Sequence, residues 1–283
     1  MRLDHTNSLI AFTNLVKDCE GILSPDATHS HNRMNNMGEG LEEYIKDLFC
    51  NTVRDSLDEK MQEHSRHFSW LGNMNNIPDI MIRGGDAIEV KKIERLTSTL
   101  QLNSSYPKNK LFSDDTRISE GCRTCENWDR KDIIYAVGVV EGLKLKHLWM
   151  VYGDCYAAER GVYTRISDTV SRGIRQIPDV DLVEDTNELA RLNRVDPLGI
   201  TDMRVRGMWL IQNPSKVFEY IPETREGFAN MLMLTSKYNS FPAEDRRELE
   251  ALIGPNFTIL DKQIKDPNNP ARLLDAKLLT LGR

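Results

Sequence analysis

Two short apolar runs joined by a pair of glycines constrain the fold of this chain more than any other stretch. Residues 78–91 read PDIMIRGGDAIEVK. Each run is too short to form a stable helix, and two glycines between apolar runs are typical of a hairpin turn. The stretch therefore predicts two antiparallel strands, at 79–83 and 87–93, joined at Gly84 and Gly85.

The second predicted strand carries an acid and a lysine on the same face. Side chains alternate along a strand, so Glu89 and Lys91 point the same way. Asp79 begins the partner strand, and the hairpin brings it toward Glu89. Two carboxylates and a lysine suit a hard divalent cation such as Mg²⁺, which shares its shell with water and phosphate. The alternative is an exposed hairpin with an incidental Glu–Lys pair, because this spacing is degenerate.

Phosphodiester hydrolysis is a reaction that needs each of these parts. Negative charge builds on the attacked phosphate, and a bound Mg²⁺ stabilises that charge and lowers the pKa of a bound water. Lys91 has three possible roles: it can orient the attacking water, deprotonate it, or hold the phosphate. The residues alone therefore allow a metal-dependent nuclease.

This stretch resembles the PD-(D/E)xK nuclease motif, with Pro78-Asp79 and Glu89-Val90-Lys91 in the motif positions. Further segments make the resemblance more specific, and it extends from about residue 30 to the C-terminus. The chain is similar to NgoPII-type type II restriction endonucleases at residues 38–49, 83–92, 102–105, 204–209 and 268–271.

The resemblance implies a site-specific deoxyribonuclease that uses Mg²⁺, with Mn²⁺ as a substitute. Asp79, Glu89 and Lys91 would be its catalytic residues, and Asp79 and Glu89 its metal ligands. The enzyme would be a homodimer that cuts a short palindrome in double-stranded DNA, with GGCC as the expected target, leaving 5′-phosphate and 3′-hydroxyl ends. A cognate DNA methyltransferase would be its genetic partner.

A helix predicted at residues 38–57 precedes the hairpin, with its apolar side chains on one stripe. Glu39, Glu42 and Glu43 crowd its first turn, where negative charge also favours the helix dipole. In nucleases of this superfamily the corresponding helix often supplies a further acid to the metal site. Glu42 matches that position best and is a fourth catalytic candidate.

Two stretches carry candidate DNA contacts. Residues 96–118 are polar, and amide, hydroxyl and ammonium groups can bind base edges or phosphates, although such a composition is also that of an ordinary surface loop. The candidates there are Gln101, Asn103, Ser104, Ser105 and Lys108. Arg204 and Arg206 share a face of a strand predicted at 200–213, where they can read guanine, clamp phosphate or form a surface salt-bridge pair.

The predicted fold class is mixed α/β, a restriction-endonuclease-like core with a central mixed sheet flanked by helices. Apolar runs at 132–140 and 147–153 predict strands buried on both faces. A helix at 156–176 is expected to cover the sheet, and 225–238 is predicted as helix. We expect one domain over residues 1–283. Its catalytic core is placed at about 38–176, and residues 177–283 are expected to serve DNA recognition and dimerisation.

The formal net charge of −6 does not exclude a DNA-binding protein, since binding depends on where the basic groups lie. No apolar run approaches the roughly 18 residues of a membrane span, and no signal peptide is evident, so a cytoplasmic protein is expected. Cys122 and Cys125 have zinc-knuckle spacing without a second ligand pair, which favours two reduced thiols in a loop. Two other functions stay open: a repair or resolvase nuclease, and a non-catalytic DNA-binding protein.

Overall fold

A computed structural model describes residues 5–23, 40–73, 76–102, 105–141, 144–179, 181–183 and 188–282. The candidate residues Glu39, Asn103 and Ser104 lie outside these ranges. Within them, none of the helices is both long enough and apolar enough to cross a membrane.

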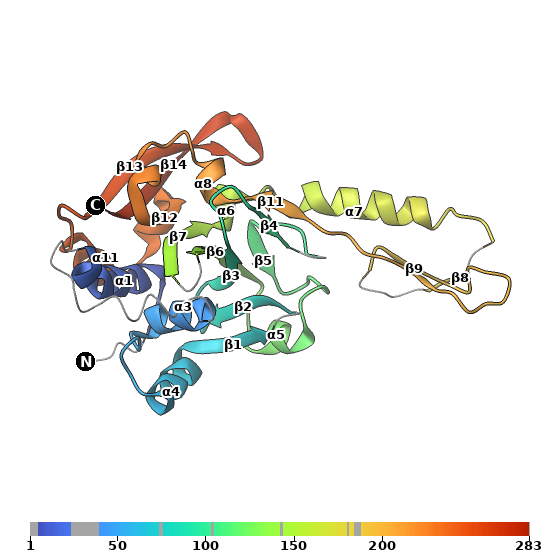
Figure 1. Ribbon diagram of the computed structural model, residues 1–283, viewed down its shortest axis with the longest axis horizontal. Helices are drawn as coiled ribbons and strands as arrows, with labels where there is room; N and C mark the ends of the chain where they lie inside the picture. The colour runs from blue at the N-terminus through green and yellow to red at the C-terminus, as the bar shows by residue number, and fades with distance from the viewer. Residues whose placement is uncertain are drawn as a thin grey trace.

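A large mixed β-sheet forms the body of the molecule (Figure 1). Its strands β3 and β6 are parallel, as are β7 and β12, whereas the other neighbours are antiparallel. The mixed α/β class is therefore confirmed. In spatial order the strands are β1 (Phe68–Asn73), β2 (Asn76–Ile82), β3 (Ala87–Ile93), β6 (Arg130–Glu141), β7 (Lys144–Tyr152), β12 (Gly227–Leu234), β14 (Asn269–Gly282) and β13 (Phe257–Asp266), with β5 (Lys110–Phe112) pairing with β6.

The predicted hairpin and the buried strands after it are confirmed. β1, β2 and β3 form a meander, and β6 and β7 lie at the centre of the sheet, where nearly every described residue of both strands is buried. The sheet continues through β12, β14 and β13, so it extends well beyond the core expected at 38–176.

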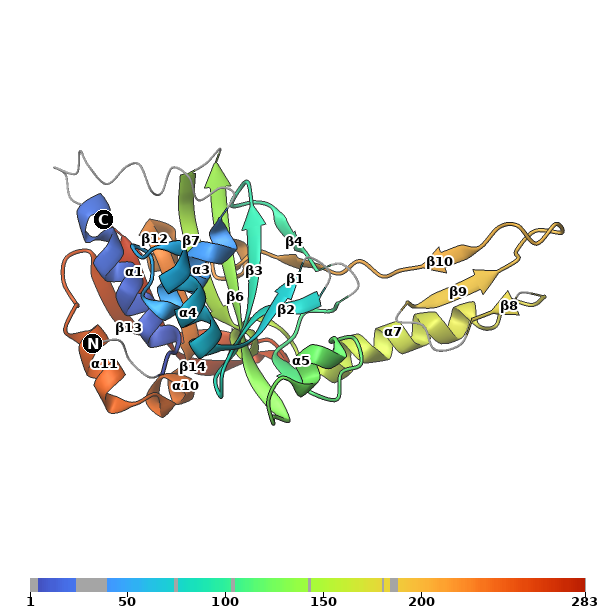
Figure 2. The same cartoon turned by 90° about the horizontal axis from the view of Figure 1, so that it is seen from below.

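Helices α1, α3 and α4 lie over one face of the sheet (Figure 2). The buried apolar side chains of α1 and α3 join the hydrophobic core of the sheet, α4 packs against α3 and β1, and α11 packs beside α1. The helices outside the protruding part described below are α1 (Ser8–Leu23), α3 (Leu41–Cys50), α4 (Leu57–His67), α5 (Glu120–Thr124), α6 (Gly153–Tyr156), α8 (Pro214–Val217), α9 (Glu223–Glu226), α10 (Thr235–Ser240) and α11 (Ala243–Glu250).

The helix expected at 38–57 is shorter in the structure, and a separate helix follows it. α3 ends at Cys50 because Asn51 adopts a left-handed conformation, φ 54°, and its N–H bonds back to the carbonyl of Asp47. α4 then begins after Ser56, whose capping box with Glu59 satisfies the free backbone groups of the first turn. Asn after the last turn and the Ser-x-x-Glu pattern are the local signals for this break.

The prediction that the helix at 156–176 covers the sheet is wrong. α7 (Arg160–Ile174) forms, but it points away from the body beside a small sheet made of β8 (Asp181–Leu182), β9 (Ala190–Asn193) and β10 (Met203–Val205) (Figures 1 and 2). The sheet is covered instead by the short helices α6 and α8, with Phe218 packed on Trp149 at a centroid distance of 5.6 Å. We call residues 160–209 the arm.

The helix predicted at 225–238 is mostly wrong as well. Residues 227–234 form β12, which lies between β7 and β14, and the helical residues of the range belong to the ends of α9 and α10 on either side of that strand. Six of the eight residues of β12 are buried, so the strand lacks the alternation of apolar and polar residues that would mark it in the sequence. The two thiols at 122 and 125 are expected in a loop, but Cys122 lies in the short helix α5. It is buried there, with its Sγ 3.2 Å from Sδ of Met81.

Candidate active site

The hairpin that carries the two predicted acids depends on its glycine turn. Ile80 pairs with Ile88 and Met81 with Ala87 across the two strands. Gly84 has φ +65°, which glycine adopts without strain. A Cβ on Gly85 would lie 2.8 Å from Cγ2 of Ile82, so a side chain there would displace the strand.

Buried groups from outside the hairpin hold this turn in place. The ammonium of Lys131, on β6, donates to the carbonyls of Gly85 at 2.6 Å and Ile82 at 3.2 Å. The carboxylate of Glu126 accepts from the N–H of Gly84 at 3.0 Å and pairs with Lys131. The turn is therefore tied to the central strand of the sheet, which positions the acids further along the hairpin.

Asp79, Glu89 and Lys91 come together as the strand geometry predicts. Glu89 is 4% exposed, and its Oε1 accepts from Nζ of Lys91 at 2.5 Å. Oδ2 of Asp79 accepts from the N–H of Val90 at 2.6 Å, so Asp79 lies against the backbone of β3 next to Glu89. The second oxygen of Glu89, Oε2, is buried and has no hydrogen-bond partner among the described residues.

The electrostatics of the site show an excess of buried negative charge. Burial raises the pKa of Glu89 to about 7 despite the neighbouring Lys91, and the carboxylate of Asp79 adds to the rise. Burial also raises the pKa of Asp79, although the bond from Val90 and the charge of Lys91 oppose it. Burial alone would lower the pKa of Lys91, but Glu89 outweighs this and raises it. One lysine therefore does not balance the two acids.

Helix α3 brings a third acid toward this pair. Gly138 on β6 lets the helix approach, because a Cβ there would lie 2.6 Å from the side chain of Leu41. The charge of Glu42 acts on the pKa of both Asp79 and Lys91, which places Glu42 on the side of the helix that faces the site.

Lys46 is a residue of the site that the sequence reasoning missed. Its ammonium, largely buried, lies 2.8 Å from Oε1 of Glu42 and 2.7 Å from Oε1 of Glu43. Its charge also opposes the rise in the pKa of Asp79 that burial causes. The signal was the spacing of Glu42 and Lys46, four residues apart on one helix, where side chains meet.

The acids present fit a magnesium ion. The described residues contain no group of three or more His, Cys, Asp or Glu side chains close enough to form a complete cage. Mg²⁺ does not need one, since it binds through one or two carboxylates and fills its shell with water and phosphate oxygens. The unpartnered Oε2 of Glu89 beside Asp79 is the kind of donor that such an ion requires.

The candidate DNA contacts of residues 101–108 differ in how accessible they are. Gln101 is exposed on β4 (Thr99–Gln101), opposite Leu210 of β11 (Leu210–Gln212). Ser105 is half-buried, and its N–H bonds to the carbonyl of Leu102. Lys108 does not lie where a phosphate ligand should: it is 3% exposed, with its ammonium 2.6 Å from Asp115 and over the ring of Tyr106. Burial lowers the pKa of Lys108, although the neighbouring Asp115 opposes this shift.

Arg204 and Arg206 point the same way, as predicted, and both donate hydrogen bonds to the same carboxylate, that of Glu188. Nε of Arg204 lies 2.8 Å and Nε of Arg206 2.6 Å from Oε1 of Glu188. Both arginine side chains are more than half exposed. Their hydrogen bonds lower the pKa of Glu188 to about 2. In this structure the pair therefore forms the surface salt bridge that the sequence allowed, on the arm and open to solvent.

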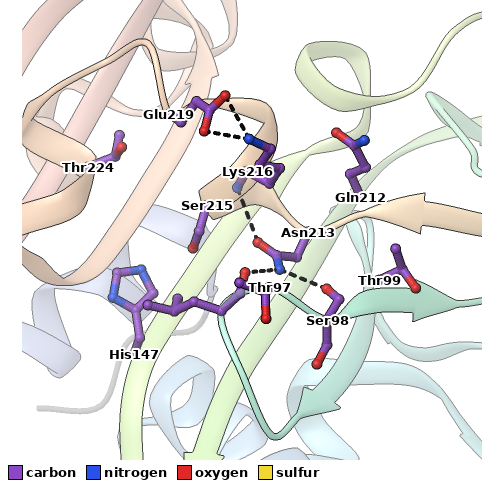
Figure 3. Close-up of a pocket in the computed structure, with 11 residues that line it drawn as sticks. Thr97, Ser98, Thr99, His147, Gln212, Asn213, Ser215, Lys216, Glu219 and Thr224 are labelled. Atoms are coloured by element: carbon purple, nitrogen blue, oxygen red, sulfur yellow. Dashed lines mark hydrogen bonds and ion pairs between the residues drawn. The ribbon is translucent and has the colours of Figure 1, made fainter.

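A pocket of about 530 Å³ lies elsewhere, where β4 meets β11 and α8 (Figure 3). Asn213 organises its wall by donating to the carbonyl of Ser98 at 2.7 Å and capping α8. Lys216 faces Glu219 across the rim at 2.8 Å. Burial lowers the pKa of His147 to about 4, so this imidazole is neutral at physiological pH. The pocket shares no residue with the acid–lysine site.

Two comparisons with known proteins identify the class. The model of the NgoPII restriction endonuclease family matches residues 6–265. The chain belongs to this family, and its class is that of the type II restriction enzymes. It is 48% identical over 257 residues to the type II restriction enzyme NgoPII of Neisseria gonorrhoeae, which covers 89% of this chain and 91% of that one. No solved structure matches the chain. The resemblance seen in the sequence is confirmed.

Proposed function

We propose that this enzyme hydrolyses phosphodiester bonds of double-stranded DNA at a short palindrome, with GGCC as the expected target, and leaves 5′-phosphate and 3′-hydroxyl ends. The observation that carries the mechanism is the buried, unpartnered Oε2 of Glu89 beside Asp79, with Lys91 2.5 Å from the other oxygen. Kinship with NgoPII supports the reaction class.

Asp79 and Glu89 would hold the cation, and Mg²⁺ would supply charge neutralisation at the phosphate and a more acidic bound water. Lys91, on the same strand face, is placed to hold the attacked phosphate or to orient the attacking water. Glu42 would complete the site from α3, with its position set by Lys46. Mn²⁺ is a suitable substitute for the oxygen ligands present.

For DNA binding we propose Arg204, Arg206, Gln101 and Ser105, together with Asn103 and Ser104 from outside the described residues. Lys108 is left out because its ammonium is buried against Asp115. A palindrome has the same 5′-to-3′ sequence on both strands, so a two-fold homodimer matches its symmetry.

Digestion of plasmid DNA by the purified protein, followed by sequencing of the ends, tests the proposal. We expect discrete fragments in Mg²⁺ or Mn²⁺ that all end within one palindrome, and no cutting in chelator. Cleavage that persists in chelator would contradict the metal mechanism, and cleavage confined to branched or damaged duplexes would point to a repair or resolvase nuclease.

A further inference from the structure

The arm carries an unusual share of the exposed apolar surface. Nine of the seventeen large apolar side chains that are exposed in the described chain belong to residues 160–209. The arm stands clear of the body in both views (Figures 1 and 2). Single exposed apolar residues are normal, but a concentration of them marks an interaction site.

Beyond its first turn, helix α7 buries little of its surface against the described part of the chain. Of its fifteen residues only Ser167 is buried. Near its start, Tyr163 stacks on Tyr106 with ring centroids 5.4 Å apart and meets the edge of Trp209 at 5.5 Å. A helix of this length without a packing partner is only marginally stable in water, because most helical stability in proteins comes from burying an apolar face. Within the described chain, the apolar face of α7 is therefore left without a surface to pack against.

The side chains that remain uncovered form one stripe. Val162, Ile166 and Val170 follow one another at intervals of four residues, which places them on one face of the helix. They are 43%, 45% and 42% exposed. Arg165 and Arg172, seven residues apart, share a different face. DNA binds through basic groups that neutralise its phosphates, so the uncharged stripe favours a protein partner.

We propose that this stripe packs against the same stripe of a second copy of the chain, with the two α7 helices antiparallel about a two-fold axis. The inference deepens the proposed function, since it locates the homodimer interface that a palindrome-cutting enzyme needs. The stripe is complementary to itself: Ile166 lies at its centre and meets the partner's Ile166, while Val162 meets the partner's Val170. A two-fold interface requires such self-complementarity.

Further exposed apolar side chains of the arm would have to add to the area that these three residues bury. A stable dimer buries about 800 Å² on each partner, from about 20–30 residues. Leu198, Ile200 and Met203 are 80%, 79% and 54% exposed on the same arm, and the body leaves them uncovered. With α7 at its centre, an arm-to-arm interface would have an apolar core, as protein interfaces ordinarily do.

Sedimentation of the free protein over a range of micromolar concentrations tests the interface. We expect a dimer for the wild type, and for Ile166→Asp a dissociation constant higher by at least roughly a hundredfold, because each dimer would place two carboxylates on the axis. Ile253→Asp is the matched control, since Ile253 is 52% exposed on the body, and it should keep the dimer. Circular dichroism and the melting temperature confirm that both variants fold.

Cross-linking with a short bismaleimide keeps the proposal testable if Ile166→Asp does not fold. Ile166→Cys should give a covalent dimer. Val162→Cys mixed with Val170→Cys should also do so, whereas either alone should stay at the wild-type background set by the native cysteines. Self-linking by Val162→Cys alone would exclude the antiparallel arrangement.

Two results would overturn the interface: a monomeric wild type, or a dimer of undiminished stability in Ile166→Asp. A monomeric wild type in which Ile166→Asp abolishes duplex binding would in addition make DNA the occupant of the stripe. The failures are distinguishable from failure of the proposed function, since sequence-specific plasmid cleavage by the wild type is scored separately. An enzyme that cuts its palindrome while Ile166→Asp stays dimeric would refute the interface alone.

Discussion

Glu89 is the residue at which stability and function conflict. A buried carboxylate oxygen without a partner costs folding free energy, because it has lost its water and gained no hydrogen bond. Such a cost is typical of functional sites. Lys91 satisfies one oxygen of Glu89, and nothing among the described residues satisfies the other. The chain therefore keeps at Glu89 an acid that a folding criterion alone would replace.

Glu89→Gln should abolish cleavage while leaving duplex binding nearly intact, since binding affinity comes largely from phosphate contacts elsewhere. It should also raise the melting temperature of the metal-free protein at pH 8. The folded pKa of Glu89, about 7, lies above its ordinary value of 4.5, so the wild type loses stability as the pH rises through this range.

Two measurements check this prediction, cleavage of plasmid DNA and thermal unfolding with and without Mg²⁺. Mg²⁺ should stabilise the wild type and not Glu89→Gln. Glu94→Gln, an exposed change on the residue after β3, is the control and should behave as wild type. Near-normal cutting by Glu89→Gln in Mg²⁺ would contradict the assignment of Glu89 as a catalytic metal ligand.

Arg204→Ala and Arg206→Ala separate base reading from phosphate binding. A base-reading arginine should lose about 1–3 kcal/mol at the cognate site and blur specificity, whereas a phosphate-binding one should weaken all duplexes alike and flatten the salt dependence. In the free protein both arginines are held by Glu188, which DNA would have to displace.

The check is binding of each variant to cognate and scrambled duplexes across a salt series in Ca²⁺. We expect the cognate duplex to lose more. An equal loss on both duplexes for both variants would move base reading elsewhere, most directly to Gln101 and its neighbours.

At the scale of elements, a buried network around Asp47 joins α3 to α4. Asp47, 4% exposed at the end of α3, accepts from the hydroxyl of Thr52 at 2.8 Å and contacts the ring nitrogen of His64 at 3.3 Å. Lys60 pairs with its other oxygen. The network fixes α4 against α3, and α3 in turn carries Glu42 toward the site.

Asp47→Ala should lower the free energy of unfolding by about 3–5 kcal/mol, because it leaves buried partners without their charge. Burial raises the pKa of Asp47, but the bonds from His64, Lys60 and Thr52 outweigh it and the net shift is downward. The wild type should therefore hold this contribution above the ordinary pKa of 3.8 and lose it as the pH falls further.

Urea unfolding between pH 3 and pH 7 measures both effects. The difference between wild type and Asp47→Ala should shrink toward the acid end. Asp58→Ala, exposed in the first turn of α4, is the control and should change stability by less than about 1 kcal/mol. A difference that is constant across the whole range would contradict a role for the ionised carboxylate.

At the scale of the whole molecule, a chain with a net charge of −6 must bind a polyanion. Part of that negative charge is concentrated at the acid site, where a divalent cation would neutralise it. We expect specific duplex binding to strengthen when Ca²⁺ replaces chelator, without cleavage, and cutting to follow when Mg²⁺ is added. Gel-shift and cleavage assays on the same duplex check this order. Equal binding with and without divalent cation would mean that the acids do not face the DNA.

The sequence by itself determined what depends on neighbouring residues. The glycine turn, the alternation that puts Glu89 beside Lys91, and the apolar runs of β6 and β7 are local patterns, and the structure confirms them. The same-face placement of Arg204 and Arg206 belongs to the same group.

Only the tertiary structure decided what depends on contacts between distant segments. Residues 227–234 contain good helix formers, yet they form a strand because β7 and β14 offer hydrogen bonds on both sides. α7 has the periodicity of a covering helix, but it points away from the body, and the short helices α6 and α8 contact the central strands. Lys108 is buried because folding brings Asp115 and Tyr106 to its ammonium. Periodicity shows that a face is apolar, and only the packed chain determines what covers it.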